Sequence, residues 1–266
     1  MRVGIIGGGF MGEAFLRGLL RSGAAAPSEI AVAEVVEARR TVLSEHGVRI
    51  TDDAESAAIG AEVVLVAVKP QDFEAAAQAL AGAIPAAAVL LSVAAGIRLA
   101  DVQRHARHRI SVRVMPNLPA AIGEGASVYY AASDLSPGQR EIVERVLSAV
   151  SSVVVEVSDD DAIDLATAVH GSGPAYVYMV IESMIEAAVR LGMKRPDAQG
   201  LVLATVAGAA RYALASETAP AELRYAVTSP GGTTAAAIAE LEAAGLRAAF
   251  DDAIEAAYSR AQELGE

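Results

Sequence analysis

The sequence predicts an α/β protein in which a doubly wound sheet is followed by an all-helical region. Three observations support this fold class. Short β-branched runs alternate with helical patterns in the first half of the chain, and a glycine-rich turn directly follows the first of these runs. From Asp159 onward no convincing strand pattern is present, and long alanine-rich helical patterns follow one another. Strands that alternate with helices are typical of a parallel sheet with helices on its faces.

Each expected strand of the first half is a short, nearly continuous apolar run, as in strands that are buried on both faces. The expected strands are Arg2–Ile6, Ile30–Ala33, Val63–Val68, Val89–Val93, Ile110–Val114, Ser127–Tyr130 and Val153–Val157. The expected helices between them include Glu13–Ser22, Val36–His46, Gln71–Leu80 and Gln139–Ala149.

The second half is expected to contain helices only: Asp160–Val169, Pro174–Leu191, Pro196–Ser216, Ala221–Val227 and Thr234–Leu264, the last with a break at Gly245. We place the boundary at Ser158, so that residues 1–158 form the sheet domain and residues 159–266 the helical domain. About 108 residues (266 − 158) are too few to bury all the alanine-rich faces, because small domains bury less of their surface. We therefore expect these helices to pack against another subunit.

Composition excludes several classes of protein. Hydrophobic residues make up 53% of the 266 residues, so a sizeable core is possible. The formal charge of −12 argues against nucleic-acid binding, which needs clustered lysine and arginine. No cysteine is present, so disulfides are impossible and a cytoplasmic location fits. Neither a signal peptide nor a membrane span is expected, and the histidines lack partners of metal-ligand type, so no metal site is predicted.

The glycine-rich turn Gly7–Gly12 (Gly-Gly-Gly-Phe-Met-Gly) fits the pattern G-x-G-x-x-G between a strand and a helix. Gly7 permits the tight turn, Gly9 allows a pyrophosphate to approach the backbone, and Gly12 allows close packing of helix on strand. Phe10 and Met11 open the helix, whose free N–H groups favour phosphate. The sequence therefore predicts a Rossmann-type domain that binds a nicotinamide dinucleotide; a glycine-rich turn without a ligand is the alternative.

Glu34, at the end of the second expected strand, bears on the choice of cofactor. A carboxylate at that position can accept hydrogen bonds from the ribose hydroxyls and repels a 2′-phosphate, which favours NADH over NADPH. Arg39 and Arg40 follow closely and are able to reach a 2′-phosphate, unless both lie on the solvated face of a helix.

Four further stretches identify the reaction more closely than the fold does. They are Ala67-Val68-Lys69-Pro70, Arg113-Val114-Met115-Pro116-Asn117, Gly171-Ser172-Gly173-Pro174-Ala175-Tyr176, and Leu223 to Thr234, which ends in Thr-Ser-Pro-Gly-Gly-Thr-Thr. In this order they resemble the motifs of pyrroline-5-carboxylate reductases, over essentially the whole chain. That resemblance implies NAD(P)H-dependent reduction of the cyclic imine 1-pyrroline-5-carboxylate to L-proline, by an enzyme that self-associates as a dimer or a larger oligomer.

The resemblance also implies roles for individual residues. Thr234 is expected to place a hydroxyl at the imine nitrogen, and the backbone around Gly232 and Thr233 to receive the substrate carboxylate. The remaining expected substrate residues are Ser229, Gly231 and Asp161, and the remaining expected cofactor residues are Ala67, Val68, Lys69, Pro70, Ala94 and Asn117.

Each of these roles has a simpler alternative. Pro230-Gly231-Gly232 cannot continue a helix, so Thr233 or Thr234 begins a new one, and Thr233 could be an ordinary N-cap. Asp161 could belong to an exposed helix start, Asn117 to a capped turn and Lys69 to a solvated strand end.

Two departures from the family pattern and two rival functions remain open. His170 stands where relatives usually have serine, and Val35 where many carry a polar or basic residue. A β-hydroxyacid dehydrogenase would need a lysine on a helix of the second half, but Lys194 lies in a loop. A nucleotide sensor that retained the fold would have no use for the Ser-Pro-Gly-Gly-Thr-Thr stretch.

Overall fold

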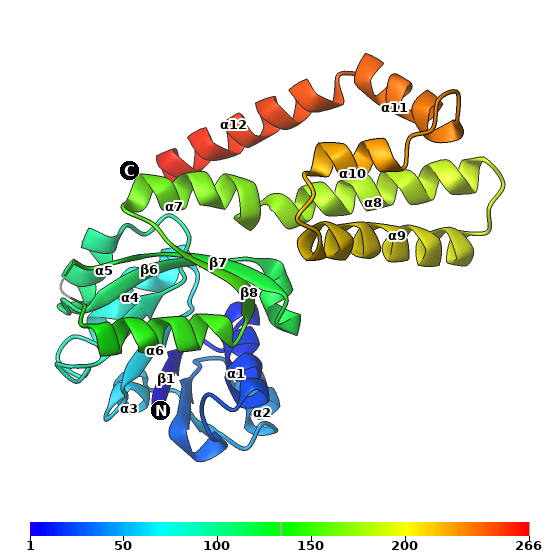
Figure 1. Ribbon diagram of the computed structural model, residues 1–266. Coiled ribbons are helices and arrows are strands. Elements are labelled where there is room, and N and C mark those ends of the chain that lie inside the picture. Colours follow the sequence, from blue (N-terminus) through cyan, green and yellow to red (C-terminus); the bar gives the residue numbers. More distant parts are fainter. Residues whose placement is uncertain (134, 266) are drawn as a thin grey trace. The chain divides into compact units, whose positions relative to one another are not determined.

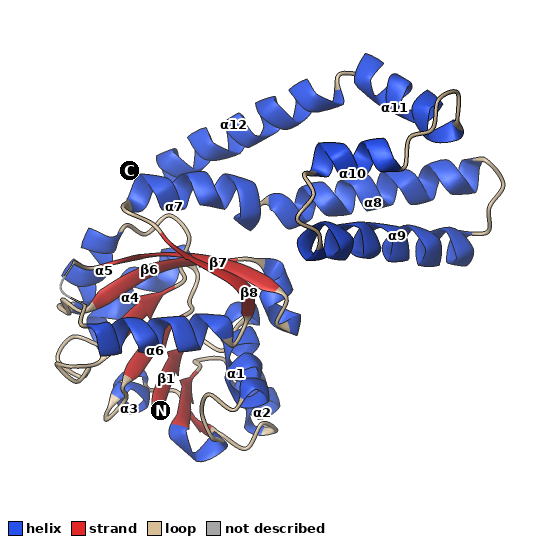
Figure 2. Ribbon diagram, viewed as in Figure 1, coloured by secondary structure: helices blue, strands red, loops and turns tan. Residues whose placement is uncertain are grey.

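The computed structural model describes residues 1–133 and 135–265, which form two compact units (Figure 1). One unit contains Met1–Ser172 together with the C-terminal segment that begins at Ala257, and the other contains Gly173–Ala256. The first unit is built on a sheet and the second on helices alone, as expected (Figure 2). Each unit is described by itself below.

The sheet of the first unit has eight strands in the order β3-β2-β1-β4-β5-β6-β7-β8. Their bounds are β1 Val3–Ile6, β2 Ile30–Ala33, β3 Arg49–Thr51, β4 Val63–Val66, β5 Val89–Ser92, β6 Ser111–Pro116, β7 Gly125–Ala131 and β8 Ser151–Glu156. All neighbouring strands are parallel except β6 and β7, so the sheet is mostly parallel, as expected, with one antiparallel pair. The reason is the short link Leu118–Ile122 between them, because a parallel connection needs a longer crossover.

Helices α3 and α5 and strand β3 of the first unit are not among the elements expected from the sequence. The helices of this unit are α1 Phe10–Ser22, α2 Glu37–Ser44, α3 Ala54–Ala58, α4 Pro70–Ala79, α5 Leu99–Ala106, α6 Pro137–Ser148 and α7 Asp160–Ala166. Strand β3 and helix α3 are only three and five residues long, too short to show a clear periodicity. Asp53 nevertheless starts α3 by accepting hydrogen bonds from the backbone N–H groups of Glu55 and Ser56.

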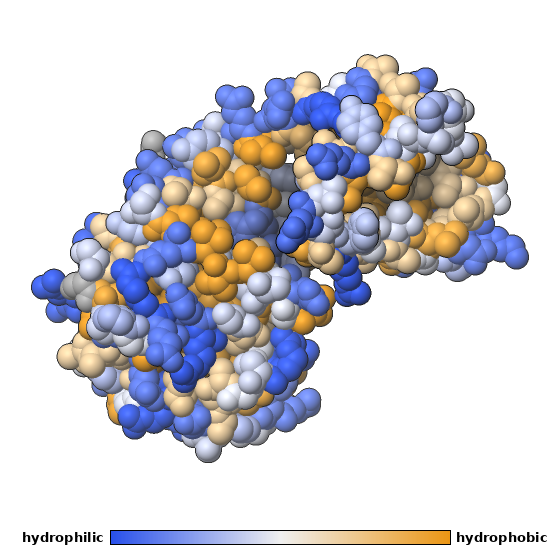
Figure 3. All heavy atoms as spheres, in the orientation of Figure 1, coloured by the Kyte–Doolittle hydropathy of each residue, from blue (hydrophilic) through white to orange (hydrophobic). Residues whose placement is uncertain are grey.

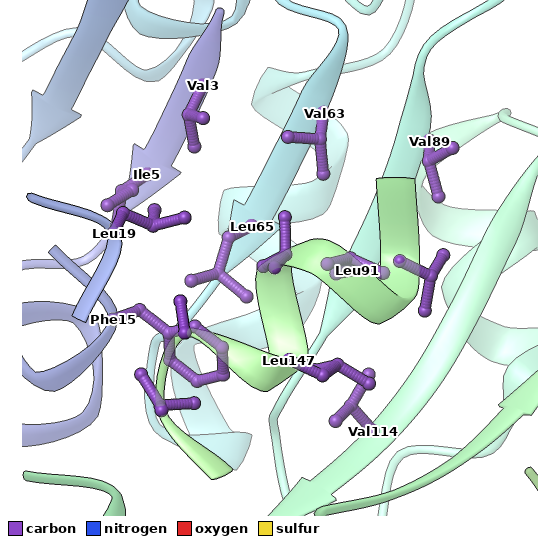
Figure 4. Close-up of a cluster of buried hydrophobic side chains, with 14 of the residues drawn as sticks. Val3, Ile5, Phe15, Leu19, Val63, Leu65, Val89, Leu91, Val114 and Leu147 are labelled. Atoms are coloured by element: carbon purple, nitrogen blue, oxygen red, sulfur yellow. The ribbon is translucent and has the colours of Figure 1, made fainter. Parts of the chain in front are cut away.

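Alternate residues of the central strands point into two separate cores, one on each face of the sheet. Ile5, Leu65 and Leu91 face the core that contains Phe15 of α1 and Leu147 of α6 (Figure 4). The residues between them belong to the second core, which is closed by α4 and α5 and contains Ile6, Val64, Val66, Phe73, Leu90 and Val102. Helices on both faces confirm the doubly wound arrangement.

The sheet ends at Glu156, close to the expected boundary at Ser158. The compact unit nevertheless continues to Ser172, because α7 and the π-helical turn Thr167–Gly171 pack against β6 and β7. The expected boundary at Ser158 therefore marks the place where strands give way to helices. That residues 1–158 and 159–266 form two independent domains stays a prediction.

The second unit has almost no core of its own. Its helices are α8 Gly173–Arg190, α9 Arg195–Ala215, α10 Pro220–Ala226, α11 Thr233–Ala243 and the first part of α12 Leu246–Leu264; Gly245, at φ +75°, separates the last two as expected. Among the hydrophobic residues of this unit only Ala198 and Val202 are buried. Large side chains that are exposed include Met179, Leu191, Leu201, Tyr212 and Leu214. Figure 3 shows hydrophobic residues, in orange, at the surface of the molecule.

Helix α9 is also long and apolar enough to span a membrane by length and composition, with a mean hydropathy of 1.2 over its best window. It is the one such helix in the described part of the chain, and only 11% of that window is buried. An exposed apolar helix is equally suited to an interface with another protein.

Candidate active site

The glycine turn lies where the order of the sheet reverses. Strands β1 and β4 are neighbours in the sheet although two strands lie between them in the sequence. In such sheets ligands bind outside the carboxyl ends of the strands at this switch point. Gly7 follows β1 there and Ala67 follows β4, and a Cβ on Gly7 would lie 2.8 Å from the Ala67 carbonyl oxygen. These two predicted cofactor residues are therefore brought together.

The glycines of the turn fit a bound pyrophosphate. Gly7 has a φ of +97°, which only glycine adopts readily. A Cβ on Gly12 would lie 1.9 Å from the carbonyl oxygen of Gly7, whereas a Cβ on Gly9 would meet no atom within 4 Å. Gly9 is the N-cap of α1, and no side chain caps the helix. Open space beside free backbone N–H groups is what a dinucleotide phosphate requires.

Glu34 is buried beside this turn. Its Oε2 accepts a hydrogen bond from the N–H of Gly8 (2.8 Å), and its Oε1 accepts one from the N–H of Val36 (2.8 Å). Gly8 itself is tightly enclosed, because a Cβ there would lie 2.2 Å from Cδ1 of Leu43. The carboxylate thus holds the turn and remains at the end of β2, where an adenosine ribose is bound in this class of fold.

The remaining predicted cofactor residues line the same edge of the sheet. Ala67 and Val68 are half-buried behind β4, Lys69 is an exposed N-cap of α4, and Pro70 is the first residue of that helix. Ala94 is buried after β5, where its N–H donates to Oγ of Ser92 at 3.4 Å. Phe10 is 56% exposed at the start of α1 and Met11 is half-buried.

Asn117 orders the end of β6. Its Nδ2 donates to the carbonyl oxygen of His170 (3.2 Å), and its Oδ1 accepts from the N–H of Ala126 (2.9 Å). The structure thus supports the loop-ordering alternative for Asn117, and a direct contact with the cofactor stays a prediction.

His170 is a bridge within the first unit. Its Nδ1 lies 2.6 Å from the carbonyl oxygen of Ala166, and its Nε2 lies 2.8 Å from that of Met115. This histidine therefore joins the π-helical turn to β6 and has a structural role, as one histidine on a mainly apolar helix usually has.

A buried ion cluster attaches α7 to the sheet and was not foreseen. Arg113 of β6 contacts Asp160 through Nη1 (2.7 Å) and Asp164 through Nη2 (2.5 Å), with side chains 3%, 18% and 1% exposed respectively. Asp161, the predicted substrate residue, points elsewhere: its side chain is 62% exposed and lies 3.7 Å from Nη2 of Arg98. An arginine inside an otherwise apolar strand was the signal that a buried carboxylate must face it.

The second unit contains the other predicted site residues in one turn between α10 and α11. Gly231 has a φ of +69°, and a Cβ on Gly232 would lie 2.4 Å from Oγ of Ser229. Helix α11 begins at Thr233 with Gly232 as its N-cap, so Thr233 is not the N-cap and no side chain caps the helix. In the described part of the chain, the hydroxyls of Thr233 and Thr234 make no hydrogen bond. Free hydroxyls beside uncapped N–H groups suit a small carboxylate.

Comparison with known proteins covers the whole chain. A family model for pyrroline-5-carboxylate reductase dimerisation matches residues 160–264, and one for coenzyme F420-dependent NADP oxidoreductases matches residues 2–96. A pyrroline-5-carboxylate reductase from Synechocystis is 42% identical over 266 residues, covering 100% of this chain and 98% of the relative. One from Pseudomonas aeruginosa is 40% identical over 266 residues, covering 100% and 97%. The chain belongs to the pyrroline-5-carboxylate reductase family.

Solved structures of the pyrroline-5-carboxylate reductase family have the same fold as this chain. The pyrroline-5-carboxylate reductase of Coxiella burnetii superposes with a TM-score of 0.91 at 34% identity, covering 100% of this chain and 98% of the other. A pyrroline carboxylate reductase of Plasmodium falciparum, solved with NADP bound, has a TM-score of 0.89 at 25% identity, with the same coverage of both chains.

Family membership accounts for the exposed helices of the second unit. The dimerisation model covers all of α8 to α12, including the apolar helix α9. The protein therefore self-associates through its helical region, as expected from the small size of that region. Lys194, the acid/base lysine that a β-hydroxyacid dehydrogenase would need, is an exposed N-cap of α9. In the described part of the chain no cluster of potential metal ligands is found.

Proposed function

We propose that this pyrroline-5-carboxylate reductase reduces 1-pyrroline-5-carboxylate to L-proline with NADH as its preferred cofactor, as the last step of proline biosynthesis in the cytoplasm. The reductase activity rests on relatives up to 42% identical over the full chain. The observation in the structure that carries the proposal is the uncapped start of α11, where the hydroxyl of Thr234 makes no hydrogen bond to any of the described residues.

When bound, the nicotinamide cofactor would supply a hydride to the imine carbon, so the chain must supply a proton to the imine nitrogen. We assign that task to the Thr234 hydroxyl, because a hydroxyl without an intramolecular partner can donate to a substrate nitrogen. The reaction forms one C–H bond and one N–H bond, and the hydroxyl regains its proton from water. No strong acid is needed, because addition of the hydride makes the imine nitrogen strongly basic, and positioning contributes much of the rate.

The substrate carboxylate is assigned to the N–H groups that begin α11. Gly232 is the N-cap and Thr233 the first residue of this helix, at the end where the helix dipole favours an anion. Gly231 provides the left-handed turn that exposes these groups, and Ser229 packs beneath Gly232. Asp161 stays a candidate substrate residue, since its carboxylate is 62% exposed, although Nη2 of Arg98 lies 3.7 Å away.

The preference for NADH is supported by the hydrogen bonds that the charged side chains near the end of β2 already make within the protein. Both oxygens of Glu34 accept backbone N–H groups and each retains a lone pair for a ribose hydroxyl. Arg40 is used as well, because its Nη1 donates to the carbonyl oxygens of Glu34 (3.0 Å) and Val35 (2.8 Å). A 2′-phosphate would meet the Glu34 carboxylate, and both arginines that follow it, Arg39 and Arg40, are already engaged with acceptors of the protein.

The test is oxidation of reduced nicotinamide by the purified protein with 1-pyrroline-5-carboxylate, with NADH and NADPH assayed in parallel. We expect turnover with both cofactors and a kcat/KM about tenfold higher with NADH, the scale of one charge interaction near the surface. A higher kcat/KM with NADPH would overturn the cofactor preference. No turnover with either cofactor, from protein that still binds them, would overturn the reaction.

Assembly is tested separately by light scattering. We expect a dimer or a larger oligomer, because the second unit buries only two hydrophobic residues and exposes the apolar faces of α8 and α9. A stable and fully active monomer would contradict this prediction. The measurement should be repeated across protein concentrations, since dissociation of an oligomer depends on concentration.

A further inference from the structure

We infer that Glu13 is a determinant of cofactor specificity, because it holds Arg39 against the glycine turn and so keeps that cation away from a 2′-phosphate. The inference rests on the proposed nicotinamide-dependent function and explains how a chain with arginines near the ribose site favours NADH. From the sequence alone, Arg39 is either a ligand of a 2′-phosphate or a solvated residue. The contacts of Arg39 in the structure support neither alternative.

Arg39 is held by two acceptors at once. Its Nη2 donates to the carbonyl oxygen of Gly8 (2.6 Å) and to Oε2 of Glu13 (2.6 Å), and its Nε donates to the same carbonyl oxygen (3.2 Å). The carbonyl alone would leave the guanidinium charge unbalanced, so the carboxylate of Glu13 makes this position favourable. Arg39 thereby links α2 to the first turn of α1.

Glu13 is suited to hold a cation permanently. Its side chain is only 15% exposed, against 36% for that of Arg39. The hydrogen bond from Arg39 is the main reason why the pKa of the Glu13 carboxyl lies below its usual value, although partial burial opposes this. Arg17, one turn further along α1, contacts the other oxygen at 2.5 Å, and His46 lies 3.7 Å from that same oxygen. The carboxylate is therefore ionised at neutral pH and engaged on both oxygens.

The Gly8 peptide unit connects this pair to the ribose site. The N–H of Gly8 donates to Glu34 and its carbonyl oxygen accepts from Arg39, so the turn is fixed from both sides without a ligand. In this class of fold an acidic residue at the end of the second strand receives the ribose hydroxyls, and a nearby arginine accommodates a 2′-phosphate. Glu13 decides which of the two applies here, because it competes with the phosphate for the guanidinium.

The test is Glu13→Gln, which keeps the size and hydrogen-bonding ability of the side chain but removes its charge. Binding of NADPH and NADH is measured by the fluorescence of the cofactor itself, and kcat and KM are measured in parallel. We expect the affinity for NADPH relative to NADH to rise about five- to tenfold, on the scale of one charge interaction near the surface. The change should fall on Kd and KM, with kcat unaltered.

Two further variants separate this role from a structural one. Arg17→Met removes the exposed partner of Glu13 and leaves the contact with Arg39 intact, so the cofactor ratio should not change. In Glu13→Gln/Arg39→Met the cation is absent and the gain in NADPH affinity should disappear. An unchanged ratio in Glu13→Gln, in protein with a normal melting curve, would overturn the inference, as would a gain that persists without Arg39.

Cofactor binding is read without turnover, so the outcomes remain distinguishable. If the wild type binds both cofactors but does not reduce the imine, the proposed reaction fails while the binding ratios still test Glu13. If the wild type binds NADPH more tightly than NADH, the proposed preference fails, and the shift caused by Glu13→Gln is still measured against that new baseline.

Discussion

Replacing Thr234 by alanine is expected to lower kcat about 100-fold, the usual contribution of a positioned proton donor, with little change in KM. The hydroxyl is lost while the backbone N–H groups assigned to the substrate carboxylate remain. Thr234 is the second residue of α11 and makes no capping contact, and alanine is a better helix former than threonine. The loss of activity is therefore not expected to come from unfolding.

Thr234→Ser is the matched control, since it retains the hydroxyl and should keep most of the activity. Thr233→Ala, at the preceding and more exposed position, should act mainly on KM. The kcat and KM of each variant are measured by steady-state kinetics with saturating cofactor, and its folding is checked by a thermal melt. A Thr234→Ala enzyme with wild-type kcat would show that the proton comes from another group.

Replacing Arg113 by methionine is expected to lower the free energy of unfolding by about 3–5 kcal/mol, the usual cost of removing one partner of a buried ion pair. Methionine fills much of the volume but leaves the carboxylate of Asp164, which is 1% exposed, without its cation. Among the described residues, the other oxygen of Asp164, Oδ2, already lacks a hydrogen-bond partner, so loss of Arg113 would leave the buried carboxylate poorly satisfied. Helix α7 and the π-helical turn should loosen first, because the cluster attaches them to β6.

Denaturant unfolding at a fixed protomer concentration is the measurement, because self-association contributes to stability. Arg113→Met/Asp164→Leu should recover most of the loss, since apolar residues can replace a buried pair at little cost. Arg145→Met, which breaks the exposed pair with Glu141, should change stability by less than about 1 kcal/mol. If Arg113→Met were no more destabilising than Arg145→Met, the cluster would not anchor α7.

The sequence-based reading of the fold succeeds where periodicity is strong and fails where elements are short. Strand β2 is found at the expected residues and most other elements agree within a few residues. Strand β3 and helix α3 were missed because three to five residues do not define a period. Strand β7 was expected at Ser127–Tyr130, but its antiparallel direction was not, because chain direction depends on the length of a link and not on the pattern of the strand itself.

For the candidate site, too, local features were predicted from the sequence and contacts between distant residues were not. By itself, the sequence determined the glycine turn, the acidic residue Glu34 and the start of a helix at Thr233 or Thr234, because glycine and proline constrain the backbone locally. It also predicted the family, through motifs of consecutive residues. Only the tertiary structure decided what each charge contacts: Arg39 with Glu13, and Arg113 with Asp164. These partners are 26 and 51 residues apart in the sequence, and the packing of helices on the sheet brings them together.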